Sequence, residues 1–216
     1  TARELTGSVM ATASRWDNYS VMADVGAPVT SDGTIRVRGV AKYEEGDSFT
    51  DLLHNKKLVL YGVVDADLTP DTHVSAGISY QDIDPRGTQW GGLPVWFSDG
   101  TRTDWSRSKT IGADWTSWKS TNQTMFARLQ QDIGNDWQVT VYGNRTLNKS
   151  DMRLLYLSGT VDKDTGEGLG AMAANYKGRA AQNDVGIRVT GKYQMFGREH
   201  DPVSYTHLTL PTILLV

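Results

Sequence analysis

Every second residue of this chain is apolar or small over one segment after another, and the residues between them are polar or charged. In the segment 35–44 one row has no charge, while the other carries three cations and a glutamate. A period of two belongs to β-strands, whose successive side chains point to opposite faces. The pattern recurs over residues 57–68, 73–81, 137–144 and 184–193, and more weakly over 5–13, 19–27 and 125–133. We therefore expect an all-β antiparallel meander of about eight strands.

The uncharged rows have the composition of a lipid-facing surface. They contain no Asp, Glu, Lys or Arg, and several end in an aromatic residue, as at Tyr43, Tyr80, Trp137 and Tyr193. A charge near the bilayer midplane of a barrel costs roughly 2–4 kcal/mol, and aromatic residues gather at the two membrane interfaces. No run of about 18 apolar residues is present to form a spanning helix. The rows predict a transmembrane β-barrel with a polar interior.

The connections between the expected strands differ in length on the two sides. Short connections alternate with longer ones, and outer-membrane barrels are built with short turns on one rim and long extracellular loops on the other. The expected tight turns lie at 31–33, 70–72, 134–136 and 195–197, and the expected loops at 15–18, 45–56, 84–118 and 152–180.

Composition excludes several other classes of protein. The chain has 7 Trp, 9 Tyr and 22 Gly, which is unlike a disordered segment. Its net charge of -3 gives no basic surface for nucleic acid, and it has no Cys. The four His are scattered, and the Asp residues of the loop 84–118 do not follow a calcium-loop pattern. We expect no catalytic residues, no metal ligands and no cofactor, and hence no enzyme.

Eight short runs, taken in order, resemble the TonB-dependent ferric-siderophore receptors, and in particular those for hydroxamate and pyoverdine-type siderophores. The similarity extends over about residues 1–200. The runs are RWDNY at 15–19, GDSF at 46–49, VDADLTPDT at 64–72, SYQ at 79–81, WGGLP at 90–94, FSDG at 97–100, STNQT at 120–124 and FGREH at 196–200.

The resemblance implies a 22-stranded barrel in the outer membrane of a Gram-negative bacterium, filled by an N-terminal plug. Such a receptor binds ferric siderophore in an outward-facing pocket. It imports the siderophore when the plug contacts the inner-membrane TonB energy-coupling complex. Iron then arrives within its siderophore and requires no protein ligand. The expected partners are the ferric siderophore, outer-membrane lipid and the TonB complex.

On this resemblance the chain is part of a longer protein. Residues 1–201 would be the first eight strands, without signal peptide, plug or later strands, and with two open sheet edges. Residues 202–216 depart from the family pattern, because two prolines and an apolar block suit neither a central strand nor a polar loop. We predict that this tail is not native and that it does not continue the meander.

Aromatic residues gather in the third long loop. A bulky, partly apolar chelate needs aromatic walls, with cations near its oxygen atoms. The candidate ligand-binding residues are Trp90, Trp96, Phe97, Trp105 and Arg102. These residues could instead pack the loop or remain solvated. Two further tryptophans near the start of the next strand, Trp115 and Trp118, are better candidates for the interfacial aromatic girdle.

Two other classes of protein share parts of this pattern. A complete eight-stranded outer-membrane barrel with a structural or adhesive role would have the expected number of strands, but its last strand would pair with its first. A secreted β-sandwich that binds carbohydrate through loop Trp residues would need the apolar rows to meet in a dry core. The sandwich does not account for the sorting of the loops.

Overall fold

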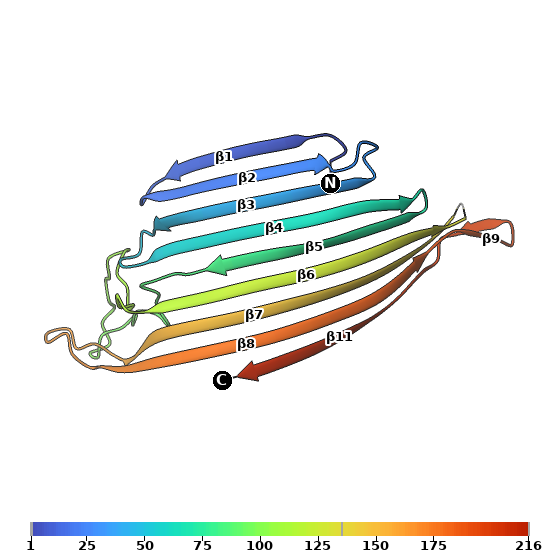
Figure 1. Cartoon of the computed structure of the whole chain (residues 1–216). Coiled ribbons are helices and arrows are strands. Elements are labelled where there is room, and N and C mark those ends of the chain that lie inside the picture. The colour runs from blue at the N-terminus through green and yellow to red at the C-terminus, as the bar shows by residue number, and fades with distance from the viewer. Residues whose placement is uncertain (1, 135, 216) are drawn as a thin grey trace.

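One curved antiparallel sheet makes up most of the structure, a computed structural model that describes residues 2–134 and 136–215 (Figure 1). Nine strands follow each other in chain order across this sheet, and two short strands form a separate hairpin. The sheet contains β1 (Thr6–Ser14), β2 (Asn18–Pro28), β3 (Ile35–Asp47), β4 (His54–Thr69), β5 (Thr72–Ile83), β6 (Ser117–Ile133), β7 (Trp137–Gly159), β8 (Leu169–Thr190) and β11 (Val203–Leu215), and the hairpin contains β9 (Tyr193–Met195) and β10 (Arg198–His200).

The strand register places the uncharged rows side by side. Val64 lies opposite Val37 on one side and Ala76 on the other, and the row continues without a charge from β2 to β11. This row consists of Ala27, Val37, Val64, Ala76, Ala127, Gly143, Val185 and Leu208. We call this face of the sheet the outer face, and the opposite face the lumen face.

In the part of the chain that the structure describes, the sheet is a single layer, so its apolar outer face has no protein partner there. Val64, Ile187 and Leu60 are 45%, 44% and 42% exposed, and the buried hydrophobic residues among those described are only Ile111, Leu154 and Val161. A soluble sandwich would cover these rows with a second sheet, whereas a membrane barrel covers them with acyl chains. Within the described residues no helix is long and apolar enough to cross a membrane.

The short turns and the long loops lie at opposite ends of the sheet, as predicted (Figure 1). The turn at 195–197 is a tight hairpin with positive φ at Phe196 (53°) and Gly197 (70°), which is the type I′ arrangement. Asn135, in a third predicted turn, is outside the described residues. The loops are shorter than predicted. They cover residues 48–53, 84–116 and 160–168. The last differs most from the prediction of a loop over 152–180, because β7 and β8 continue far beyond the apolar rows.

The prediction that the tail does not continue the meander is wrong for its backbone. Residues 203–215 form β11, which pairs with β8 throughout and adds a ninth strand to the sheet. Pro211 lies in β11 opposite Gln182. Since β11 is an edge of the sheet in the described residues, one side of its backbone needs no amide donor there. The non-native origin of residues 202–216 stays a prediction.

Both edges of the sheet are open in the described part of the chain. β1 pairs only with β2 and β11 only with β8, so the first and last strands do not meet (Figure 1). An eight-stranded barrel that is complete in itself would need that closing pair. This chain therefore forms one arc of a wider barrel wall.

Candidate functional site

The long loop 84–116 docks beside β7 because β7 extends beyond its neighbour. β6 begins at Ser117, opposite Arg153, so the edge of β7 after Arg153 has no β6 partner. Two loop residues form bridges on this part of the chain: Trp90 pairs with Tyr156, and Phe97 pairs with Val161. The Ser98 amide also donates to the Val161 carbonyl at 2.9 Å. The loop thus has a defined position at the rim.

The root of the loop is fixed by a close backbone approach. Gly87 has φ of +65°, and a Cβ atom there would lie 1.9 Å from the Leu52 carbonyl oxygen. Only glycine suits this position, because another residue would be strained and would collide with backbone. Close by, Arg86 and His54 exchange both backbone hydrogen bonds, at 2.8 and 3.0 Å. The loops 48–53 and 84–116 therefore form one connected rim.

Three aromatic rings meet where the loop crosses β7 and β8. The Trp90 ring centroid lies 5.5 Å from that of Tyr156 and 5.8 Å from that of Tyr176, both in edge-on geometry. The strand register places both tyrosines on the lumen face, with Tyr176 on β8 opposite Met152. We call Trp90, Tyr156 and Tyr176 the aromatic cluster. Since Tyr156 and Tyr176 are 40% and 46% exposed, the cluster presents an accessible aromatic surface.

The other candidate residues lie on a small hairpin within the same loop. Trp96 forms a bridge with Arg102, and both side chains are exposed. Phe97 lies half-buried against Trp105, with ring centroids 5.9 Å apart. The Trp105 indole Nε1–H donates to the Pro94 carbonyl at 2.8 Å. Trp105 and Phe97 therefore brace the hairpin, whereas Trp96, 55% exposed, projects from it.

The structure corrects the interpretation of one tryptophan and adds two tyrosines. Trp118 lies opposite Met152 on the lumen face, so it is not in the lipid-facing aromatic girdle. Strand alternation from Ser117 onward sets this orientation. The prediction of a loop over residues 152–180 leaves Tyr156 and Tyr176 out of the site, whereas the structure places them on β7 and β8. Tyr156 continues the period-two row of Met152 and Leu154 on the lumen face of β7, and this spacing was the available signal in the sequence.

A carboxylate organises the neighbouring loop 160–168. Asp162 Oδ1 accepts hydrogen bonds from the amides of Thr165 and Asp164, at 2.9 and 3.0 Å, and from the Thr165 hydroxyl at 3.0 Å. The Thr165 amide, followed by its hydroxyl and the Asp164 amide, lowers the pKa of Asp162 below its ordinary value of 3.8. The loop is therefore held by the ionised form of this side chain.

We expect this loop to loosen in acid. Because the folded pKa of Asp162 is lowered, its stabilising effect is present above the ordinary value of 3.8 and is lost as the pH falls through the folded pKa. A nitroxide label at Lys163 should gain mobility as the pH falls below about 4. In Asp162→Ala the label should be mobile already at pH 7, while Asp162→Asn should be intermediate. Equal mobility in all three proteins at pH 7 would contradict this role.

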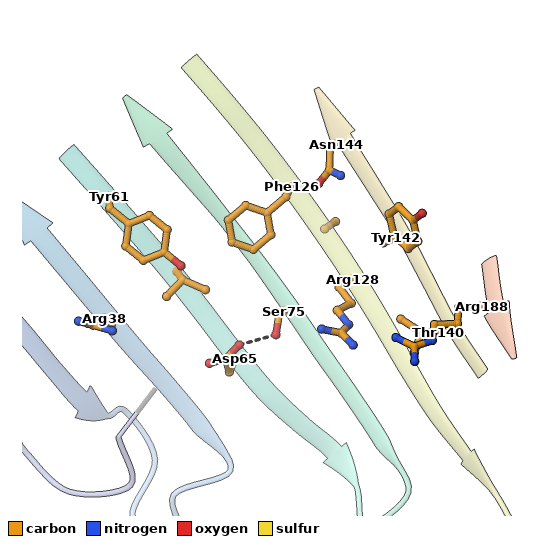
Figure 2. A pocket seen from close by; sticks show the side chains of 12 residues that line it. Arg38, Tyr61, Asp65, Ser75, Phe126, Arg128, Thr140, Tyr142, Asn144 and Arg188 are labelled. Carbon is orange, nitrogen blue, oxygen red and sulfur yellow. Dashed lines mark hydrogen bonds between the residues drawn. The ribbon is translucent and has the colours of Figure 1, made fainter. Parts of the chain in front are cut away.

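A hollow lies on the lumen face, nearer the short-turn end of the sheet. It has a volume of about 520 Å³ and is lined from β3 to β8. Figure 2 shows Arg128 and Arg188 on the same side of the sheet as Asp65, whose carboxylate accepts a hydrogen bond from the Ser75 hydroxyl. Arg38 donates from Nε to Asp24 at 2.9 Å. The hollow is polar, which suits a wet or protein-filled interior.

The predicted lumen-face charges pair with one another along the sheet. Arg36 donates to Asp67 at 2.8 Å, and Lys42 donates to Glu44 at 2.7 Å. Among the described residues, no group of three or more His, Asp or Glu side chains could hold a metal ion. The lumen face therefore has the character of a polar wall.

Comparison with known proteins places this wall in a family. The chain is 37% identical over 201 residues to the ferripyoverdine receptor of Pseudomonas aeruginosa, covering 93% of this chain and 24% of that receptor. The chain is homologous to ferripyoverdine receptors. It is also 31% identical over 201 residues to the ferric-pyoverdine BN7/BN8 receptor of Pseudomonas putida, covering 93% of this chain and 25% of that one. No protein-family model matches the chain.

The solved structures agree in fold. The crystal structure of the ferripyoverdine receptor of the Pseudomonas aeruginosa outer membrane, bound to ferripyoverdine, superposes with a TM-score of 0.91 and 37% identity, over 95% of this chain and 27% of that one. This confirms the predicted barrel fold, the resemblance to siderophore receptors and the outer-membrane location. These homologues are receptors and not enzymes. The chain spans about a quarter of the length of the curated relatives it matches.

Proposed function

We propose that this chain is part of a receptor that binds a ferric siderophore of the pyoverdine class at the outer surface and imports it. The observation that carries the proposal is the 37% identity to the ferripyoverdine receptor, which continues through 93% of this chain. The iron is cargo within its chelate. The protein then needs a shaped pocket and has no need of a metal site.

The aromatic cluster supports this function by its position and chemistry. It lies at the long-loop end of the sheet, which is the extracellular rim of such barrels, and on the lumen face. Rigid aromatic rings give a bulky chelate a large contact area at low cost in side-chain entropy. Arg102 on the exposed hairpin adds a cation suited to an anionic chelate. We assign ligand contact to Trp90, Trp96 and Arg102, and support of the hairpin to Phe97 and Trp105.

Import needs parts of the receptor outside this chain. We propose that a plug domain inside the completed barrel couples siderophore release to the TonB complex. The polar lumen face, with its hollow of about 520 Å³, suits contact with such a domain. Uptake of radiolabelled ferric pyoverdine into a receptor-deficient strain should therefore require the full-length gene and an intact TonB gene. Uptake that continues at the same rate without TonB would refute the coupling.

Trp90→Ala in the full-length receptor should weaken ferric pyoverdine binding about 10- to 100-fold. The change removes a ring that supports both tyrosines of the aromatic cluster, and buried aromatic anchors are worth about 1–3 kcal/mol in binding. Trp90→Phe should recover most of the affinity, and Trp96→Ala should show a smaller loss. Binding is measured by fluorescence quenching on purified receptor.

Trp137→Ala is the matched control, because Trp137 lies at the opposite end of β7 on the outer face. It should leave the siderophore affinity unchanged. If the Trp90→Ala and Trp96→Ala receptors both bind ferric pyoverdine as tightly as the unaltered receptor, neither residue belongs to the binding pocket.

A further inference from the structure

The outer face of β7 and β8 becomes cationic beyond the apolar rows. On β7 the outer-face row changes from Val139, Val141 and Gly143 to a row that is mostly charged, and this row consists of Arg145, Leu147, Lys149, Asp151 and Arg153. All of these charged side chains are exposed. We define the outer cationic patch as Arg145, Lys149, Arg153, Lys177 and Arg179, with Asp151 as the acidic residue among them.

The patch brings like charges together. Lys149 and Arg179 are direct cross-strand partners, and like charges at such positions destabilise a sheet. Asp151, the acidic residue of the patch, forms an ion pair with Lys177 at 3.6 Å. The other four cations have no ion pair within residues 2–134 and 136–215. An anion from outside the chain would relieve this repulsion.

Neighbouring strands show the opposite arrangement at the same end of the sheet. Their outer-face charges are matched by acids or bases of the chain itself. Lys56 pairs with Glu45 at 2.8 Å, and Lys119 pairs with Asp82 at 3.4 Å. The excess positive charge is therefore specific to β7 and β8.

The height of the centre of the patch matches the membrane surface. Trp137 begins β7 at the short-turn end, and Lys149 follows 12 residues later (149 minus 137). At about 3.3 Å per residue this is roughly 40 Å along the strand. With a tilt of about 40°, Lys149 lies roughly 30 Å above Trp137, just beyond an apolar band of about 25 Å. Side chains there meet lipid headgroups, on the extracellular side.

We propose that the outer cationic patch binds the phosphate-bearing headgroup of a glycolipid in the outer leaflet. Charge complementarity and height select this occupant, because phosphate oxygens accept charge-assisted hydrogen bonds from Arg and Lys. Lys149 and Arg179 form the centre of the site, and Arg145 and Arg153 flank it along β7. The inference rests on the outer-membrane location and is independent of siderophore binding.

The test compares two double variants of the full-length receptor in detergent. Lys149→Gln/Arg179→Gln removes the centre of the patch. The control Lys56→Gln/Lys119→Gln removes two outer-face cations that the chain itself pairs. Binding of purified lipid A, a diphosphorylated glycolipid, is measured by native mass spectrometry. The patch variant should bind it roughly 10- to 30-fold more weakly, and the control within twofold of the unaltered receptor.

Further arms separate the sources of the anion. Inorganic phosphate at the same concentration should neither bind measurably nor displace lipid A, and dephosphorylated lipid A should bind as weakly as the patch variant binds lipid A. Equal binding of lipid A by all three receptors would overturn the proposal, as would full competition by inorganic phosphate. The proposal would also be overturned if the patch captured an acidic partner protein while the patch variant bound lipid A as tightly as the unaltered receptor. Ferric pyoverdine affinity should be unchanged in the patch variant, so this test is distinct from that of the proposed function.

Discussion

Val64→Arg in the full-length receptor is expected to destabilise the inserted barrel by about 2–4 kcal/mol. Val64 is in the middle of the uncharged outer row, with Val37 and Ala76 as its cross-strand neighbours, and it is 45% exposed from the sheet. Arginine would have to leave the acyl-chain region or draw water into it. The change corresponds to a roughly 30- to 700-fold shift in the folding equilibrium. Urea titration in lipid vesicles, followed by resistance to protease, measures it.

The control places the same arginine on the wet face. Ser79→Arg changes a lumen-face residue of β5, whose neighbours are Tyr61 and Thr124. It should cost less than about 1 kcal/mol, since lumen residues tolerate charge. Equal destabilisation by the two variants would show that the uncharged rows do not contact lipid, and the assignment of the two faces would be wrong.

The sequence predicts the membrane part of this fold well because that part obeys a simple rule. Lipid excludes charge from alternate residues, so the rows in β3, β4 and β5 can be recognised by inspection. The rule ends with the bilayer. From Lys149 onward on β7 both faces are wet, the apolar alternation disappears, and the strands cannot be distinguished from a loop. The ladder between β7 and β8 nevertheless continues to Gly159 and Leu169 through backbone hydrogen bonds.

The tail shows a different limit of local reasoning. Its two prolines argue against a central strand, and the structure instead forms β11 at an edge, where proline is tolerated. The register with β8 also determines which side chains of β11 lie on the lumen face and which lie on the outer face. Thr209 donates to Asp184 at 2.6 Å on the lumen face, while Leu208 continues the outer apolar row. Pairing with a long neighbouring strand supplies information that the segment itself does not contain.

The sequence predicts which types of residue form the candidate site, but only partly which residues they contact. A loop with several aromatic residues near an extracellular rim indicates a binding surface, which identified Trp90 and Phe97. Their partners, Tyr156 and Val161, follow more than 60 residues later. That pairing depends on where β6 begins, because β6 leaves the edge of β7 open beyond Arg153. No local pattern near Trp90 encodes this.

Leu154→Ala should undock the long loop from the sheet while leaving the barrel inserted. Leu154 is only 2% exposed, and it lies on the lumen face of β7 two residues before Tyr156, the bridge partner of Trp90. Truncating a buried leucine costs about 2–5 kcal/mol, since the cavity that remains adds to the lost burial. That cost falls on the docking of residues 84–116, because the lumen face is otherwise open. Protease cleavage within this loop should accelerate at least 30-fold, and ferric pyoverdine affinity should fall with it.

Leu155→Ala separates docking from strand stability. Leu155 is the next residue of β7 and belongs to the outer face, opposite Ala173, so its truncation removes the same atoms from the other side of the same strand. Loop cleavage and siderophore affinity should remain near those of the unaltered receptor. If both variants accelerate cleavage equally, the loop depends on the strand as a whole and not on the buried contact at Leu154. If neither does, the bridges of Trp90 and Phe97 hold the loop without a hydrophobic core, and the aromatic cluster is positioned by backbone pairing alone.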